Sequence, residues 1–135
     1  MSMRGNRIAR RARSLVGVRF RPQGRDPVLG LDCIGAAAAA AQVPAQRVAR
    51  GYALRGQHLA AIEQGLSELG WRPVPADQAA AGDVLVCEAG PAQFHLIVRA
   101  WDSFVHADAG LRRVVERPLP APWPVAGAWR FFEGG

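Results

Sequence analysis

The sequence contains no lysine: its 17 basic residues are all arginines, against 11 acidic residues in a chain of 135. The resulting net charge of +6 permits weak attraction to anionic polymers. Eight of the arginines precede residue 26, but no aromatic-rich sheet motif, zinc-finger spacing or helix-turn-helix pattern accompanies them. We therefore expect a solvated basic face and no specific nucleic-acid partner, with an arginine-driven nucleic-acid binder as the alternative.

Cysteine and long apolar runs are also scarce. Cys33 and Cys87 can form one bridge at most, which is too few for a disulfide scaffold and favours a reducing compartment. The longest apolar run, residues 34–41, is far shorter than the ~20 residues that a membrane-spanning helix needs. Arg19 and Arg21 interrupt the apolar stretch that a secretion signal would place after its basic start. These absences predict no membrane insertion and synthesis in the cytoplasm without a signal peptide.

The composition is that of one globular domain over residues 1–135. Of the residues, 50% are hydrophobic and 21% are charged, with 15 glycines and 10 prolines. A domain of this size buries roughly two thirds of the surface that its unfolded chain exposes, so it needs no disulfide or structural metal. We see no internal repeat and no linker, and therefore expect a single domain.

The first half of the chain has the pattern of helices. Apolar residues recur at helical spacing between arginines over residues 5–16. An alanine-rich segment, residues 33–42, follows Asp32, which is a good N-cap. Helical spacing of leucine and isoleucine predicts a third helix over about residues 56–69. Residues 17–30 contain several glycines and prolines and predict an ordered loop.

The second half has the pattern of strands. Short β-branched or aromatic segments are separated by glycine, proline and aspartate. The expected strands are residues 84–87, 94–99, 103–107, 112–116 and 126–132. Helices followed by a run of antiparallel strands predict an α+β domain, with helices packed on one face of a sheet of about five to six strands.

Cys33 is a candidate nucleophile because it lies in the first turn of an expected helix. A helix N-terminus carries about half a positive charge and several free N–H groups, which favour a thiolate and can bind the oxyanion of an acyl-transfer intermediate. The alternative is that Cys33 is a small buried hydrophobe beside the alanine run. We expect Cys87, inside the first expected strand, to be a core residue.

Two histidines each interrupt an apolar strand. His95 and His106 lie on consecutive expected strands joined by a short link. If that link has an even number of residues, the two rings share a face of the hairpin, directly opposite or diagonal, about 5 to 8 Å apart. We therefore expect His95 to act as the base for Cys33 and His106 to orient His95. His58, at the start of the third helix, has no polar constellation around it and is expected to be a surface or structural residue.

A zinc site is the competing use of the same side chains. It would take its ligands from Cys33, Cys87, His95 and His106. Neither cysteine has the close-spaced partner that is common in structural zinc sites, which disfavours this alternative.

Four segments of the chain match, in order, the motifs of one family. They are residues 30–35 (GLDCIG), preceded by residues 20–27 (FRPQGRDP), then residues 81–86 (AGDVLV), 94–98 (FHLIV) and 104–107 (FVHA). In this order they resemble the nucleophile motif, the strand entering the sheet, the base-bearing strand and the strand of the third catalytic residue of the NlpC-type papain-like cysteine peptidases, which cut bacterial cell-wall peptides. The resemblance extends from about residue 10 to the end, and the motifs look most like those of the compact versions of tailed phages and gene transfer agents.

The resemblance implies a papain-like fold with Cys33, His95 and His106 as the catalytic residues and no cofactor. It also implies that Asp32 contacts the free amine of a peptide stem. The family usually has tyrosine where Phe20 falls and serine where Ile34 falls. Phe20 is nevertheless expected to lie in the substrate site, and both differences bear on substrate preference.

The implied activity is hydrolysis of peptidoglycan stem peptides, at the bond between a γ-D-glutamyl residue and a diamino acid. Without a secretion signal, the resemblance implies delivery to the periplasm or cell wall as a component of a phage-like tail, in contact with tail or baseplate hub proteins. Two alternatives share the scaffold: a structural tail module without turnover, and an acyltransferase or deamidase.

Overall fold

The computed structural model describes residues 2–48 and 58–132. Over these two ranges it contains three α-helices, two short 3-10 helices and eight strands. The helices are α1 (Met3–Ser14), α2 (Cys33–Ala41), η1 (Ala45–Arg47), α3 (Leu59–Leu69) and η2 (Ala76–Gln78). The strands are β1 (Arg25–Asp26), β2 (Gly30–Leu31), β3 (Trp71–Val74), β4 (Val84–Gly90), β5 (Gln93–Arg99), β6 (Ser103–Asp108), β7 (Arg113–Pro118) and β8 (Val125–Phe131).

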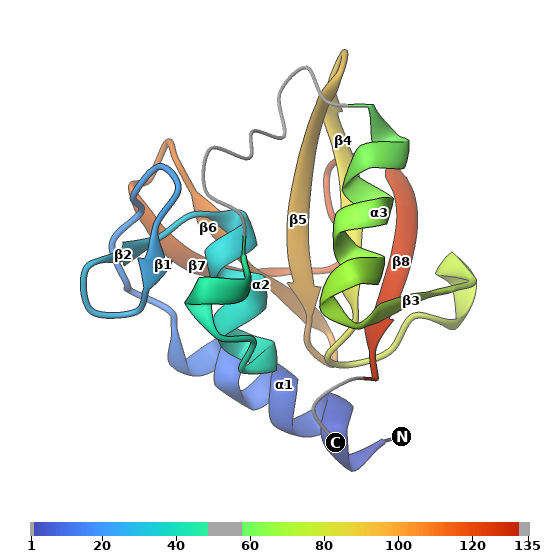
Figure 1. Ribbon diagram of the computed structural model, residues 1–135, viewed down its shortest axis with the longest axis horizontal. Coiled ribbons are helices and arrows are strands. Elements are labelled where there is room, and N and C mark those ends of the chain that lie inside the picture. The colour runs from blue at the N-terminus through green and yellow to red at the C-terminus, as the bar shows by residue number, and fades with distance from the viewer. Residues whose placement is uncertain (1, 49–57, 133–135) are drawn as a thin grey trace.

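Six strands form one antiparallel sheet in the order β3-β8-β4-β5-β6-β7, and β1 and β2 form a separate hairpin. The main core lies between the helices and one face of this sheet, and Figure 1 shows α2 and α3 in front of the strands. A smaller core lies on the other face, beneath the β7–β8 loop. The α+β class, the helices on one face and the strand number are confirmed.

The helices begin close to the expected residues. The Ser2 hydroxyl accepts a hydrogen bond from the Gly5 N–H and so starts α1 two residues earlier than its apolar pattern predicted. Asp32 caps α2 as expected. The first two residues of the expected third helix, 56 and 57, lie outside the described residues. Within the described ranges, the helices are all too short or too polar to cross a membrane.

The sheet has one strand that the sequence pattern did not predict. β3 contains Pro73, which weakens a strand signal, but β3 is an edge strand and, among the described strands, pairs with β8 alone. Trp71 packs against Phe131 across this pair, with ring centroids 4.7 Å apart. The expected loop over residues 17–30 also contains the short β1 strand and begins β2.

A buried ion pair ties the start of β4 to β8. Asp83 is 2% exposed, and its carboxylate accepts two hydrogen bonds from Arg130, at 3.0 and 2.9 Å. One carboxylate oxygen also accepts from the Ala80 N–H at 2.8 Å. The Asp83 carboxylate therefore accepts hydrogen bonds from a backbone N–H and from the Arg130 guanidinium at the same time.

Replacing Asp83 with alanine should lower the free energy of unfolding by about 3 kcal/mol, because it removes the acceptor of three donors in a buried position. Urea denaturation would measure the change, with Asp77→Ala as the control because Asp77 is exposed on η2. Equal stability of the two variants would contradict the structural role of the pair.

Candidate active site

The five residues singled out from the sequence line one cleft of about 790 Å³. They are Phe20, Asp32, Cys33, His95 and His106. They come from the loop before β1, the N-terminus of α2 and strands β5 and β6. The fold thus brings together segments that are up to 86 residues apart in the chain.

Asp32 holds the start of α2 in place. Its Oδ1 accepts from the Gly35 N–H at 2.8 Å and from the Arg25 Nη1 at 2.7 Å. The Arg25 side chain is 1% exposed, so this is a buried ion pair. The sequence pattern did not indicate Arg25, because a lone arginine in an arginine-rich loop gives no signal of burial. The pair orients the first turn of the helix, and with it Cys33.

Glycines allow the loop before the helix to pack directly against that first turn. A Cβ atom on Gly35 would lie 2.0 Å from the Gly24 carbonyl oxygen, and one on Gly24 would lie 2.3 Å from the Gly30 carbonyl oxygen. Any side chain at these positions would push the loop away. This close approach is the physical reason for the glycines around the Cys33 motif.

The two imidazoles contact each other as the hairpin parity predicted. Val98 pairs with Val105 and Arg99 with Phe104, so four residues separate the last pair and the parity is even. Nε2 of His95 lies 2.7 Å from Nδ1 of His106, and the ring centroids are 4.9 Å apart. The hydrogen bond uses one nitrogen of each ring and leaves Nδ1 of His95 available to another group.

The rings lie on the sheet face that also carries Cys87, whereas α2 packs on the opposite face. Strands β5 and β6 pair in the described structure only beside their turn, and beyond it they diverge, as Figure 1 shows behind α2. The backbone N–H groups of Leu96 on β5 and of Ile34 on α2 face the Cys33 sulfur. The thiol and both imidazoles consequently share one cleft.

An aromatic wall encloses the imidazoles. The Trp123 ring stands edge-on to His95 and His106, with centroids 5.1 and 5.5 Å away, and Phe104 lies 5.2 Å from His106. Trp123 lies in the loop between β7 and β8 and also lines the cleft. The sequence pattern did not indicate Trp123, since only the tertiary fold brings this loop to the histidines.

The enclosure favours the neutral forms of the reactive groups. Burial raises the pKa of the Cys33 thiol to about 12, although the N–H groups of Leu96 and Ile34 act in the opposite direction. Burial and the neighbouring His106 lower the pKa of His95 to about 4. Burial lowers the pKa of His106 as well. Burial therefore favours the neutral thiol and the neutral imidazoles, whereas the helix terminus by itself favours a thiolate.

The remaining candidates lie away from this chemistry. Cys87 is fully buried in the smaller core, and His58 is exposed at the N-cap of α3. In the described parts of the chain, no three side chains of histidine, cysteine, aspartate or glutamate are grouped so that they could hold a metal ion. The zinc alternative is therefore not supported by the arrangement of its four proposed ligands.

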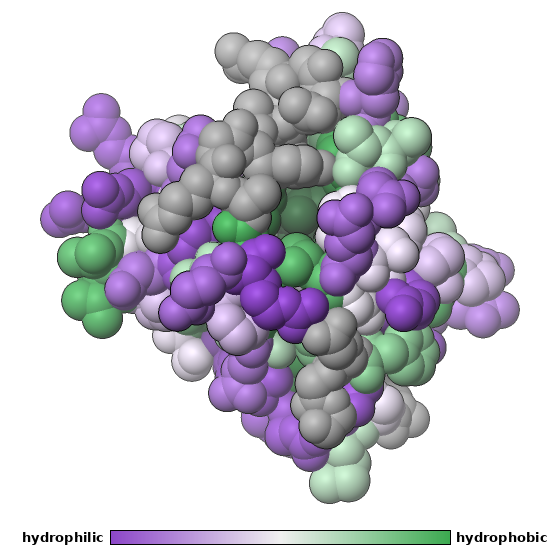
Figure 2. Space-filling model, viewed as in Figure 1, coloured by the Kyte–Doolittle hydropathy of each residue, from purple (hydrophilic) through white to green (hydrophobic). Residues whose placement is uncertain are grey.

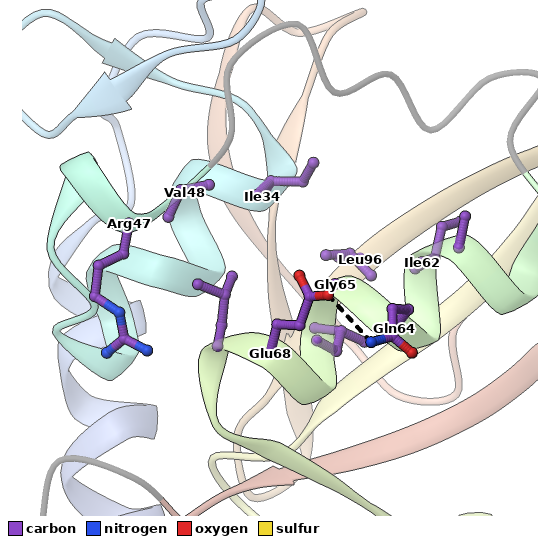
Figure 3. Close-up of a pocket in the computed structure, with 11 residues that line it drawn as sticks. Ile34, Arg47, Val48, Ile62, Gln64, Gly65, Glu68 and Leu96 are labelled. Atoms are coloured by element: carbon purple, nitrogen blue, oxygen red, sulfur yellow. Dashed lines mark hydrogen bonds between the residues drawn. The ribbon is translucent and has the colours of Figure 1, made fainter.

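A second cavity, of about 380 Å³, lies between α2, η1 and α3. Figure 2 shows hydrophobic surface in the hollow between α2 and α3. In Figure 3 Ile34, Val48, Ile62 and Leu96 surround this cavity, and the Gln64 side chain donates a 3.1 Å hydrogen bond to Glu68 in its lining. It has no cysteine or histidine among its described lining residues, so the cleft at Cys33 is the candidate active site.

No protein-family model and no curated protein matches the sequence, but solved structures match the fold. NlpC1 from Trichomonas vaginalis matches with a TM-score of 0.69 and 17% identity, over 94% of this chain and 44% of that one. The NlpC/p60 domain of the peptidoglycan hydrolase SagA matches with a TM-score of 0.62 and 22% identity, over 92% and 96%. The P60 domain of the M. avium subspecies paratuberculosis antigen MAP1204 matches with a TM-score of 0.63 and 18% identity, over 95% and 94%.

These matches show that the chain has the NlpC/P60 papain-like fold, which confirms the fold that the sequence motifs implied. The chain spans less than half the length of the Trichomonas protein. The particular likeness to phage-tail and gene-transfer-agent versions stays a prediction.

Proposed function

On the premise of an NlpC/P60 fold, we propose that the chain is a cysteine peptidase that hydrolyses peptidoglycan stem peptides. The observation that carries this proposal is the shared cleft of Cys33, at a helix N-terminus, and the hydrogen-bonded pair His95 and His106. The proposed scissile bond joins a γ-D-glutamyl residue to a diamino acid. SagA is a peptidoglycan hydrolase whose NlpC/p60 domain has the same fold, and this likeness supports the substrate class.

The neutral resting pair determines the order of proton transfers. As the Cys33 sulfur attacks the stem carbonyl carbon, its proton moves to Nδ1 of His95, because a buried thiolate alone would be unfavourable. The Gly35 N–H already donates to the Asp32 side chain and the Ala36 N–H to the Asp32 carbonyl, which leaves the Cys33 N–H to bind the oxyanion.

Loss of the amine completes the first half-reaction, and hydrolysis of the thioester is the second. His95 returns its proton to the leaving amine, the carbon–nitrogen bond breaks and a thioester with Cys33 remains. Water then loses a proton to His95 and attacks the thioester carbon. The carbon–sulfur bond breaks, His95 gives that proton to the Cys33 sulfur, and the free carboxyl product is released with the thiol restored. The hydrogen bond to His106 keeps the His95 ring oriented through both steps. No cofactor takes part in this scheme.

Asp32 and Phe20 are the proposed substrate-binding residues. Oδ1 of Asp32 already accepts hydrogen bonds from two donors. We therefore propose that the stem amine is attracted by the negative charge of the Asp32 carboxylate, which lines the cleft. Phe20 offers an apolar ring without a hydroxyl, and Ile34 an apolar side chain, so the site provides fewer polar contacts to the stem than serine and tyrosine would.

Digestion of defined muropeptides tests the proposed function. We expect mass spectrometry to find the two products of cleavage at the bond between the γ-D-glutamyl residue and the diamino acid. Transferred acyl groups or a glutamine-to-glutamate change would indicate the acyltransferase or deamidase instead, and unchanged muropeptides would indicate a structural module. Delivery by a phage-like tail predicts that the protein co-purifies with assembled particles and contacts their hub or baseplate proteins.

The pH dependence of kcat/KM should have an unusually low acid limb. His95 must be neutral to accept the thiol proton, and burial lowers its pKa to about 4, so kcat/KM should fall as the pH drops through about 4. An ordinary histidine would place the limb near ~6.5. Initial rates on one muropeptide between pH 3 and 8 measure this limb, and a midpoint at the ordinary value would contradict the burial of His95.

A further inference from the structure

Within the described residues, the imidazole pair ends at a nitrogen without a hydrogen-bond partner. Nδ1 of His106 is bonded to His95, whereas its Nε2 is buried and no described group accepts or donates a hydrogen bond there. His106 as a whole is 2% exposed. Leaving a buried polar group unpaired is unfavourable, so this nitrogen calls for a functional reason.

Asp108 places a carboxylate at that nitrogen. It lies two residues after His106 on β6, on the same face of the strand, and its Oδ2 is 4.0 Å from Nε2 of His106. Its other oxygen accepts a hydrogen bond from the Leu111 N–H at 3.0 Å, which holds the carboxylate in the β6–β7 turn. Asp108 also lines the cleft that contains Cys33.

We propose that Asp108 is a positioning residue that ends a linear chain of four groups: Cys33, His95, His106 and Asp108. Its carboxylate keeps the hydrogen of His106 on Nε2 and stabilises the positive charge that appears on the imidazole pair during attack. The proposal rests on the proposed function, because Cys33 and His95 are its reacting groups.

The positions of the hydrogens follow from this arrangement. For Nδ1 of His95 to accept the thiol proton, His95 must carry its own hydrogen on Nε2 and donate it to Nδ1 of His106. His106 then carries its hydrogen on Nε2, directed at Asp108. When the proton leaves Cys33, the new charge is shared along the chain towards the carboxylate. The Asp108 carboxylate, 4.0 Å from Nε2, then acts on His106 through its charge.

The charges around the pair support this role. Asp108 raises the pKa of both His95 and His106, against the lowering by burial. Arg117 on β7 acts in the opposite direction on His106, and its guanidinium lies 5.8 Å from the Phe104 ring centroid. Asp108 therefore offsets an unfavourable environment for the charged base, and its removal should make that base weaker.

The test measures alkylation of Cys33 by iodoacetamide between pH 3 and 8, with labelling read from the mass of the Cys33 peptide. Asp108→Asn keeps an oxygen to accept from the Leu111 N–H and removes the charge. We expect the plateau rate to fall about fivefold and the acid limb to move about half a pH unit or more to lower pH, because the imidazole loses the charge that raises its pKa. Asp77→Asn, which removes an exposed charge on η2, should change neither.

A second variant separates charge from folding. Asp108→Glu retains the carboxylate and should bring the acid limb back towards the wild-type position, even if both variants lower the melting temperature. The proposal would be overturned if the acid limb of Asp108→Asn stayed at the wild-type pH. It would also be overturned if the limb moved by similar amounts in both variants, in line with their melting temperatures and not with their charge. Digestion of stem peptides by the wild type is measured in parallel. If the wild type cuts no stem peptide but the acid limb still depends on the charge at position 108, the peptidase function is rejected and the role of Asp108 is kept.

Discussion

Replacing Cys33 with alanine is expected to lower kcat/KM on muropeptides by about 10⁴-fold or more, because it removes the protein atom that bonds to the substrate carbon in the proposed mechanism. The fold should be unaffected, since alanine is a strong helix former and Cys33 lies in the first turn of α2 beside other alanines. Release of the two stem products, followed by liquid chromatography, measures the loss.

Cys87→Ala is the matched control for this experiment. It removes the other thiol, which is buried in the smaller core and lies outside the cleft. We expect it to lower stability through the small cavity that it leaves, while kcat/KM stays near the wild-type value. Similar activity losses in the two variants, or full activity of Cys33→Ala, would show that Cys33 is not the nucleophile.

Replacing His95 with alanine is expected to lower kcat/KM by about 10³-fold, the typical contribution of a positioned general base. The effect should be large across the neutral range above the acid limb near pH 4, because burial raises the pKa of Cys33 to about 12 and the thiol then needs a proton acceptor. Single-turnover measurements of acyl-enzyme formation would locate the loss in the first chemical step.

His58→Ala is the control for His95→Ala, because His58 is exposed at the start of α3 and lines neither the cleft nor the second cavity. It should keep wild-type activity. Added imidazole is expected to restore part of the activity of His95→Ala by entering the space that the ring leaves. A His95→Ala variant that retains most of its activity would contradict the assignment of the base.

The parity of one hairpin decided much of what could be predicted about the site. Strand residues alternate between faces, so two histidines separated by an even turn must share a face, and the structure has that turn. The N-cap at Asp32 was similarly local, because capping depends on residues within one turn of helix. These local rules placed His95, His106 and Cys33 on the correct elements without any knowledge of the packing.

Other features of the site depend on contacts between distant segments. Arg25 reaches Asp32, and Trp123 reaches both histidines, through loops whose paths no local pattern describes. The edge strand β3 was hidden by Pro73, which is tolerated there because β8 is its one partner among the described strands.

By itself, the sequence determined the α+β class, the helix that carries Cys33 and the shared face of the two imidazoles, since each depends on spacing along one or two neighbouring elements. Only the tertiary structure decided that the thiol and those imidazoles line one cleft and that burial favours their neutral forms. The reason is that the loss of water around a side chain depends on every segment packed against it. At Cys33 this burial raises the thiol pKa more than the N–H groups at the helix terminus lower it.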